Sequence, residues 1–119
     1  MCLRSWLAVA TVGIMGLLLA APVHAQCTDA SKLKTNCSVS ECQTRQSKVH
    51  PTCDVPGGRT CNQSGLAKPE LMRRLTINQN CKAVRQAVAD CYKTPDSGHQ
   101  QAISDAQRAI DECNRRIGQ

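Results

Sequence analysis

The second half of the chain carries apolar and small residues at helical spacing. Between Pro69 and about Tyr92, these positions are Leu71, Leu75, Cys81, Val84, Val88 and Cys91. After a turn at 93–98, a second stripe advances by three and four residues through Ile103, Ala106, Ile110, Cys113 and Ile117. Side chains at such spacing share one face of a helix. Two helices joined by a short turn predict an antiparallel helical hairpin, with Asp96 or Ser97 as the cap of its second helix.

The first half of the domain, 26–66, is polar and rich in turns. A short helix is expected from about Ser40 to Val49, with Ser40 as its cap and His50-Pro51 as its end. The segment from Cys53 to Cys61 contains Pro and Gly and is expected to be a loop, for which a local bridge between its two terminal cysteines is one option. We therefore predict a loop-rich 26–66 followed by a hairpin over 67–119.

Residues 1–25 have the pattern of an export leader. The lone cation Arg4 precedes an apolar run from Trp6 to Ala20, and small residues favour cleavage after Ala25. The run is about 15 residues long, whereas a membrane-spanning helix needs roughly 20. We expect a cleaved signal peptide and a secreted or periplasmic product without a transmembrane anchor; an uncleaved anchor is the alternative.

Eight cysteines remain once this leader is removed. An even number of thiols in a short exported chain indicates a disulfide framework. They are Cys27, Cys37, Cys42, Cys53, Cys61, Cys81, Cys91 and Cys113. The fold class expected is therefore all-α: one small domain, 26–119, stapled by disulfides, with a C-terminal antiparallel helical hairpin.

The hairpin geometry constrains one bridge. In an antiparallel hairpin, reflection about the turn places residues opposite each other when their numbers sum to about 190. Cys81 and Cys113 nearly meet this condition, which predicts a disulfide between them. Cys91 lies about 15 Å from Cys81 along the helix and should instead staple the first half onto the hairpin. The partners of the other cysteines stay open. No cysteine pair has zinc-finger spacing, so neither a metal nor a cofactor is expected.

Charge and aromatic content limit the possible partners. Without Arg4 the chain has 14 Lys and Arg against 9 Asp and Glu, a net charge of +5. This scattered excess permits an anionic substrate or partner but specifies none. Tyr92 is the only Phe, Trp or Tyr after the leader. A protein that grips single-stranded nucleic acid needs several stacking rings, so that class is disfavoured.

Side chains capable of chemistry gather near the hairpin turn. His99 is the sharpest candidate for an acid or base, with Asp96 beside it, although a solvent-exposed or capping histidine is the more common role. Arg85, and Asn78 or Asn80, lie on the helix that leads to the turn. Arg85 has the forked donors that bind phosphate or carboxylate. Arg59 would lie beside Arg85 if disulfides fold the Cys53-to-Cys61 loop back onto the helix that carries Arg85.

Several motifs in the second half are shared with a known family. They are the Cys53-to-Cys61 loop ending in Arg59-Thr60-Cys61, then Asn80-Cys81 with Arg85, Asp90-Cys91-Tyr92, Asp96-Ser97-Gly98-His99, Ala102-Ile103, and Ala109-Ile110 before Cys113. Over about 53–117 the chain thus resembles the cysteine-rich helical C-terminal domains of bacterial polymorphic toxins, of the novel toxin 16 type. The resemblance implies an active region at Gly98-His99 with Arg85 and Asp96. Such toxins are usually the tips of large delivery proteins, whereas this chain has its own signal peptide.

Two functional hypotheses follow. In the first, the protein is a toxin effector acting on an anionic substrate: His99, Arg85 and Asp96 are catalytic, Arg59 and Asn80 bind the substrate, and a cognate immunity or target protein is a partner. In the second, it is a non-enzymatic periplasmic binding or inhibitor protein on the same scaffold. The first requires the named side chains to converge in one cleft, whereas the second predicts that His99 points away from Arg85 and Asp96.

Overall fold

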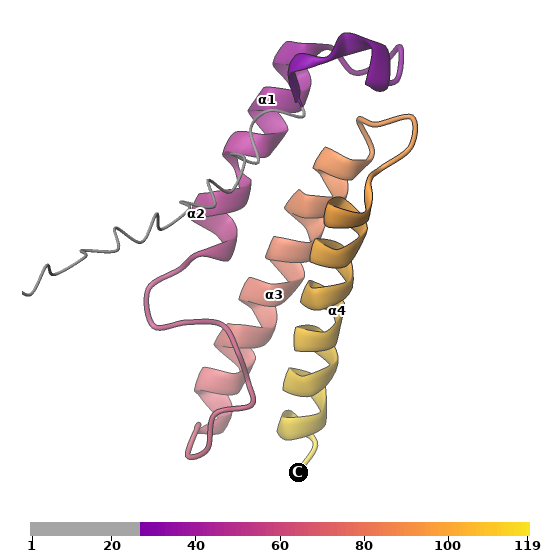
Figure 1. The fold of residues 1–119 in the computed structure, drawn as a ribbon. Helices are drawn as coiled ribbons and strands as arrows, with labels where there is room; N and C mark the ends of the chain where they lie inside the picture. The colour runs from indigo at the N-terminus through magenta and orange to yellow at the C-terminus, as the bar shows by residue number, and fades with distance from the viewer. Residues whose placement is uncertain (1–26) are drawn as a thin grey trace, which may run out of the picture.

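The computed structural model describes residues 27–119, which form an all-helical fold (Figure 1). The predicted signal peptide and its cleavage site lie outside these residues. The elements are a 3-10 helix, Ala30–Lys32 (η2), and the α-helices α1 (Val39–Ser47), α2 (Val49–Cys53), α3 (Lys68–Ala89) and α4 (Ser97–Ile117). Between residues 27 and 119, β-structure is limited to one isolated bridge that joins Leu33 to Tyr92.

The short helix of the first half begins and ends differently from the expectation. Its cap is Ser38, not Ser40, because the Ser38 hydroxyl accepts a bond from the backbone N–H of Glu41 at 3.0 Å. His50-Pro51 does not end the helical region either. The chain kinks at Lys48 and continues as α2, with Pro51 in its first turn. A proline is tolerated there because its missing N–H would have no helical partner.

The predicted hairpin is confirmed. α3 begins with Pro69 in its first turn and ends at Ala89, three residues before the expected end. α4 begins after the cap Asp96, whose Oδ1 accepts from the backbone N–H of His99 at 2.9 Å. The register is also as predicted, since the Lys82 ammonium donates to Gln107 Oε1 at 2.6 Å across the two helices.

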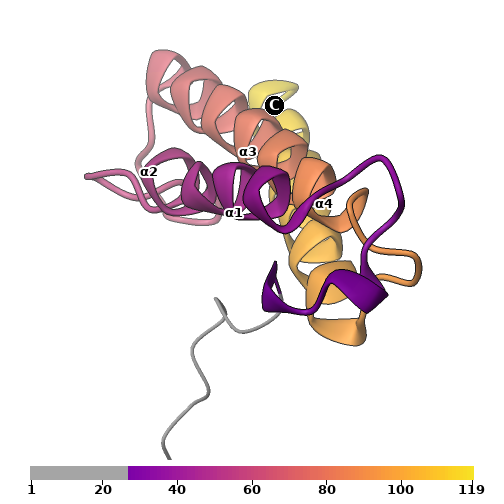
Figure 2. The same ribbon diagram turned by 90° about the horizontal axis from the view of Figure 1, so that it is seen from above.

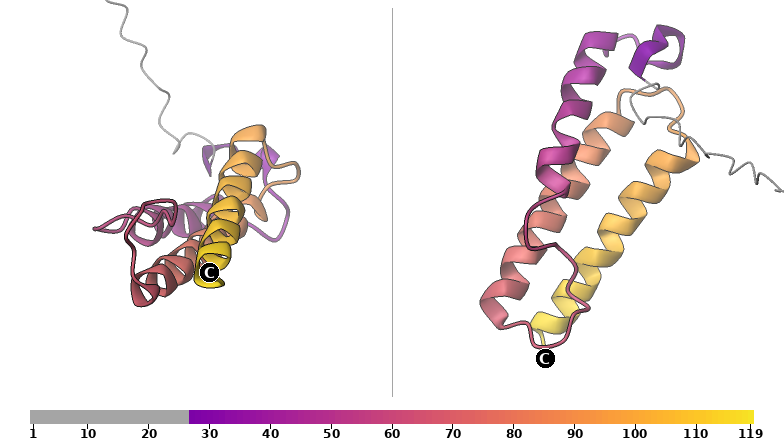
Figure 3. Two further views of the ribbon diagram at one scale, coloured as in Figure 1. Left: turned by 90° about the horizontal axis from the view of Figure 1, so that it is seen from below. Right: turned by 60° about the vertical axis from the view of Figure 1, so that its left-hand side comes forward.

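α3 is the central helix of the fold. α4 packs along it, while α1 and α2 pack against another part of its surface (Figures 1 and 2). The segment between α2 and α3 crosses the hairpin and reaches the C-terminal end of α4 before turning back into α3, as the right-hand view of Figure 3 shows. Every element described is thus attached to α3 directly or through this crossing segment.

Four disulfides join the elements. They are Cys27–Cys42, Cys37–Cys91, Cys53–Cys81 and Cys61–Cys113. The expected role of Cys91 is confirmed, because its bond to Cys37 attaches the first half of the domain to the hairpin. A local Cys53–Cys61 bridge does not form, since these two cysteines are bonded to different helices of the hairpin.

The predicted Cys81–Cys113 bridge is wrong. The residue opposite Cys113 is Asn78, whose Nδ2 lies 3.7 Å from Cys113 Sγ. Cys81 lies at nearly the same level but on the side of α3 that faces α2, where it bonds to Cys53. The level along the hairpin was predicted correctly, but a level does not specify which way each side chain points around its helix.

The buried apolar residues form two small cores. One lies near the hairpin turn and contains Cys27, Leu33, Cys37, Cys42, Val88, Cys91 and Tyr92. The other lies at the far end of the hairpin and contains Cys61, Leu71 and Cys113, with Leu66, Leu75 and Ile117 packed against it. The part of the hairpin between these cores is more polar, and Asn78 is fully buried there.

Arginines bind the crossing segment to the hairpin through its backbone carbonyls. Arg74, only 6% exposed, donates to the carbonyls of Thr60 at 2.6 Å and Gly57 at 3.1 Å. Its Nε contacts Glu70 Oε1 at 2.7 Å. Hydrogen bonds from Arg73, which has the larger effect, and from Arg74 lower the pKa of Glu70 to about 2. The carboxylate therefore stays ionised and holds both guanidiniums in place.

Asn78 satisfies the buried polar groups between the two cores. Its Nδ2 donates to the carbonyls of Arg59 at 2.7 Å and Arg74 at 3.0 Å, and its Oδ1 accepts from Arg59 Nη1 at 2.9 Å. A buried amide whose donors and acceptor are all paired stabilises the fold, whereas loss of the amide leaves its partners unsatisfied.

We predict that Asn78→Ala lowers the free energy of unfolding by about 1 to 3 kcal/mol, because the Arg59 carbonyl and guanidinium lose their buried partner. Urea unfolding of the oxidised protein measures this change. Asn80→Ala is the matched control, since Asn80 is exposed on the same helix, and its effect should stay within about 0.5 kcal/mol. Equal stabilities of the two variants would contradict this role of Asn78.

Candidate functional site

The structure divides the candidate site residues between two places. His99 and Asp96 lie at the start of α4, beside the core near the hairpin turn. Arg59 and Arg85 lie together in the middle of the hairpin. Asn80 is exposed on α3.

His99 packs as an aromatic side chain rather than opening into a cleft. Its ring meets that of Tyr92 edge to face, with centroids 4.9 Å apart, and its side chain is only 11% exposed. Nδ1 lies 3.7 Å from Asp96 Oδ1, while Nε2 is buried and has no hydrogen-bond partner among residues 27–119. A general base must reach the proton that it abstracts. Neither ring nitrogen of His99 is placed to reach a proton of a substrate.

Tyr92 connects this ring pair to the disulfides of the same core. Its hydroxyl lies 3.5 Å from Cys27 Sγ and 3.6 Å from Cys42 Sγ. Burial raises the pKa of the Tyr92 hydroxyl, and the negative charge of Asp96 raises it further. The hydroxyl therefore stays protonated at neutral pH, and the ring pair contributes packing around the Cys27–Cys42 bond.

Arg85 does not join His99. Arg85 is electrostatically coupled to Asp105, which lies six residues, or about 9 Å, further along α4 than His99. Its Nε contacts Cys81 Sγ at 3.4 Å, toward α2. The structure therefore brings His99 together with Asp96 but places Arg85 in a different neighbourhood.

Arg59 and Arg85 lie within electrostatic range of each other. Burial lowers the pKa of the Arg85 guanidinium, and the positive charge of Arg59 lowers it further, while Asp54 and Asp105 act in the opposite direction. The disulfides Cys53–Cys81 and Cys61–Cys113 fold the crossing segment over the hairpin, and Asn78 fixes Arg59 there. We call these two side chains the Arg59–Arg85 pair.

The pair differs from the other arginines of the described residues, 27–119. Five of those arginines form ion pairs, namely Arg45 with Glu41, Arg73 and Arg74 with Glu70, Arg108 with Asp105, and Arg115 with Glu112. Arg116 instead donates to the carbonyls of Cys61 and Gln63. Over the same residues, Arg59 and Arg85 form no ion pair, and each has one neutral side-chain partner. Two adjacent guanidiniums without a bonded carboxylate can receive an oxyanion.

A cleft of about 520 Å³ lies on the same side of the hairpin as the crossing segment, although neither Arg59 nor Arg85 lines it. It lies between the crossing segment and α4 and is lined by Thr60, Cys61, Asn62, Asp105, Arg108, Ala109 and Glu112. Thr60 directly follows Arg59, and Asp105 is the residue of α4 whose charge reaches Arg85. A ligand whose anionic group contacts the pair would have room for its remaining atoms in this cleft.

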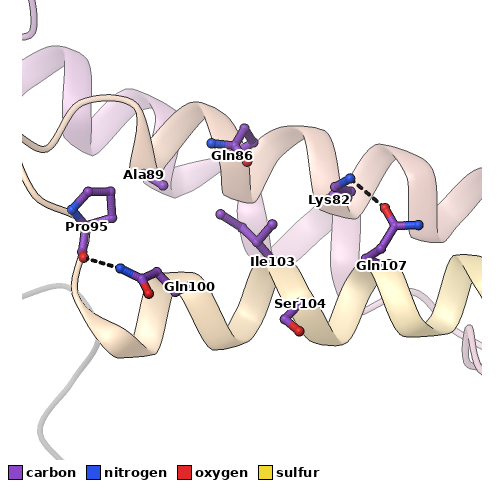
Figure 4. Close-up of a pocket in the computed structure, with 8 residues that line it drawn as sticks. All are labelled: Lys82, Gln86, Ala89, Pro95, Gln100, Ile103, Ser104 and Gln107. Atoms are coloured by element: carbon purple, nitrogen blue, oxygen red, sulfur yellow. Dashed lines mark hydrogen bonds between the residues drawn. The ribbon is translucent and has the colours of Figure 1, made fainter.

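A second hollow lies along the α3–α4 seam (Figure 4). This groove of about 460 Å³ is lined by Lys82, Gln86, Ala89, Pro95, Gln100, Ile103, Ser104 and Gln107. Two of its amide side chains form hydrogen bonds with other lining residues. Gln107 accepts from the Lys82 ammonium, and Gln100 donates to the Pro95 carbonyl at 2.9 Å. Lys82 is its only charged lining residue, and its ammonium is already bonded to Gln107.

A hydrogen-bonded pair at the end of α2 was not predicted from the sequence. His50 Nδ1 lies 2.6 Å from Asp54 Oδ2 on α2. The spacing of four residues was a usable signal, but His50-Pro51 was taken as a helix end, and that interpretation hid the pair. Asn78 was considered only as an alternative to Asn80, because burial is not visible in the helical spacing.

The described residues contain neither a cluster of metal ligands nor a membrane-spanning helix. Between residues 27 and 119, no group of three or more His, Cys, Asp or Glu side chains is arranged to hold a metal ion. None of the helices in this part of the chain combines the length and the apolar character needed to cross a bilayer.

Comparison with known proteins assigns no family. No protein-family profile, curated protein or solved structure matches the chain. The functional argument therefore depends on the geometry described above.

We predict that His99 supports stability through its ring. His99→Ala should lower the free energy of unfolding by about 1 to 2 kcal/mol, because the contact with Tyr92 is lost. His99→Phe should stay within about 0.5 kcal/mol of the native protein, since it keeps a ring and removes a buried nitrogen that has no partner. Thermal or urea unfolding distinguishes the two. A Phe variant as unstable as the Ala variant would show that the imidazole nitrogens matter.

Proposed function

We propose that this protein is a binding protein that holds an anionic group of its ligand at the Arg59–Arg85 pair. The observation that supports this most is that these two arginines, which lie within electrostatic range of each other, form no ion pair over residues 27–119, where five other arginines have carboxylate partners. Holding two like charges side by side in a partly buried place is unfavourable. A bound oxyanion would remove that repulsion and satisfy the unused N–H donors.

The compartment proposed is secreted or periplasmic. Four disulfides persist best under oxidising conditions, and the leader pattern of residues 1–25 supplies a route to them. A rigid, cross-linked surface suits a binding protein or inhibitor, because little conformational entropy is lost when it binds.

A toxin effector is the second candidate function. The resemblance of residues 53–117 to polymorphic-toxin domains supports it, and the Arg59–Arg85 pair would then anchor an anionic substrate. The position of His99 favours the binding protein instead, since its ring packs on Tyr92 and Arg85 lies elsewhere on the hairpin.

We predict that the protein binds sulfate at the Arg59–Arg85 pair. Arg59→Gln and Arg85→Gln should each weaken binding by about tenfold or more, because each removes a charged hydrogen-bond donor to the anion. Arg115→Gln is the matched control, since Arg115 is exposed and paired with Glu112 at the far end of α4. Calorimetry or chemical-shift titration of the oxidised protein gives the affinities. Equal losses in all three variants would indicate non-specific attraction to a basic protein and would refute the site.

We also predict that export of the full-length chain to a bacterial periplasm leaves growth unchanged while folded, oxidised protein accumulates. A binding protein needs no toxic activity, whereas an envelope-directed effector would slow growth. The control is a leaderless chain kept in the cytosol. Export-dependent growth arrest that Arg85→Gln relieves, at equal amounts of oxidised protein, would contradict the binding-protein proposal and favour the effector.

A further inference from the structure

The groove along the α3–α4 seam has two polar ends and an apolar middle (Figure 4). Pro95 and Gln100 lie at the end near the hairpin turn, whereas Lys82 and Gln107 lie at the other end. Ile103 projects between the two ends. Gln100 and Gln107 are seven residues apart on α4, so the ends are separated by about 10 Å. The groove volume of about 460 Å³ is within the usual range for ligand pockets.

Lys82 makes one end of the groove positive. Its ammonium has three N–H donors, one of which bonds to Gln107 Oε1 at 2.6 Å. Lys82 forms no ion pair with a carboxylate of residues 27–119, and no acidic side chain of those residues lines the groove. The remaining donors can therefore bind an anionic group. A single cation balances a singly charged carboxylate, whereas a doubly charged oxyanion would keep half of its charge uncompensated.

Gln86 and Gln100 offer hydrogen-bond acceptors along the rest of the groove. The side-chain amide of Gln86 donates to Asp90 Oδ1, and that of Gln100 donates to the Pro95 carbonyl, both at 2.9 Å. Each amide is thus held through its Nε2. The Oε1 atoms of both residues accept no hydrogen bond from residues 27–119. A ligand in this part of the groove is therefore expected to donate N–H groups.

This arrangement matches the end of an extended peptide. A chain in extended conformation advances about 3.3 Å per residue, so three residues span the distance of about 10 Å between the two ends. The terminal carboxylate would contact Lys82, and an apolar side chain would pack on Ile103. The backbone N–H groups would donate to Oε1 of Gln86 and Gln100. A fatty acid lacks these N–H groups, and a sugar would leave the apolar middle uncovered.

We propose that the α3–α4 groove binds the free C-terminal end of an extended polypeptide whose last residues are apolar, with its carboxylate on Lys82. Neither arginine of the Arg59–Arg85 pair lines this groove, so the inference concerns a second site and does not rest on anion binding at the first. It adds a class of partner, namely chains with an exposed, apolar C-terminus.

The test is a chemical-shift titration of the oxidised protein with the peptide acetyl-Ala-Ala-Leu, as the free acid and as the C-terminal amide. The free acid should bind about fivefold or more tightly than the amide, because only the acid forms a charge-assisted bond with Lys82. The shifts should centre on Ile103 and its neighbours in the groove. Equal affinities would overturn the role of the carboxylate, and no binding of either peptide would overturn the proposal.

Octanoate distinguishes a peptide from a fatty acid. It has a carboxylate and an apolar chain of similar length but no N–H donor for Gln86 and Gln100. It should therefore bind less tightly than the free-acid peptide. Octanoate binding as tight as that of the peptide would assign the groove to fatty acids and overturn the peptide assignment.

Substitutions in the groove separate the two kinds of contact. Lys82→Gln should weaken binding of the free-acid peptide about fivefold or more and leave the affinity for the amide unchanged. Gln86→Ala should weaken binding of both peptides about two- to fivefold, because it removes a neutral acceptor. The matched controls are Lys68→Gln and Gln79→Ala, which are exposed on the same helix and should keep the native affinities. An equal loss in Lys68→Gln would indicate non-specific attraction to a basic protein and would overturn the site.

Sulfate binding separates this inference from the proposed function. Lys82→Gln should bind sulfate as the native protein does, since the Arg59–Arg85 pair is intact. Peptide binding that persists in a protein without measurable sulfate affinity would support the groove while refuting the anion site. Loss of sulfate binding in Lys82→Gln would make the groove the anion site and overturn the peptide assignment.

Discussion

The stretch from Cys53 to Cys61 is bonded at its two ends to different helices of the hairpin, and the rest of the structure depends on this constraint. Cys53 is bonded to Cys81 on α3, and Cys61 to Cys113 on α4. Its eight-residue span therefore bridges the hairpin and holds the two helices together. Because each disulfide contributes about 2 to 4 kcal/mol, these bonds compensate for cores that contain few large apolar side chains.

Polar contacts beneath this segment complete the same arrangement. Its backbone carbonyls would be costly to bury alone, but Arg74, Asn78 and Arg116 donate to them. The interior between the two cores therefore combines these hydrogen bonds with the buried Cys53–Cys81 disulfide and the buried side chains of Ala106 and Ile110. One consequence is that Arg59 is carried into the hairpin beside Arg85, where no carboxylate is bonded to either of them in the described part of the chain.

The functional proposals follow from how charge is distributed over this frame. Most ionisable side chains are paired along a helix with a partner three or four residues away, which leaves them little role beyond solubility. Among the arginines of the described residues, Arg59 and Arg85 differ in having neither a carboxylate partner nor, as Arg116 has, two backbone carbonyls to bind. His99 packs against Tyr92 at the hairpin turn.

The sequence alone determined the features that arise from local spacing. The hairpin and the level of α3 against α4 follow from helical periodicity, as does the attachment of Cys91 to the first half, whereas the choice of Asp96 over Ser97 as the cap of α4 was left open. The Cys81 pairing and the separation of His99 from Arg85 were decided by tertiary structure. The physical reason is that each helical residue turns the side chain by about 100°, so residues at one level can face different neighbours. Asn78 faces α4 and Cys81 faces α2, and only the packing of three helices and a crossing segment specifies that difference.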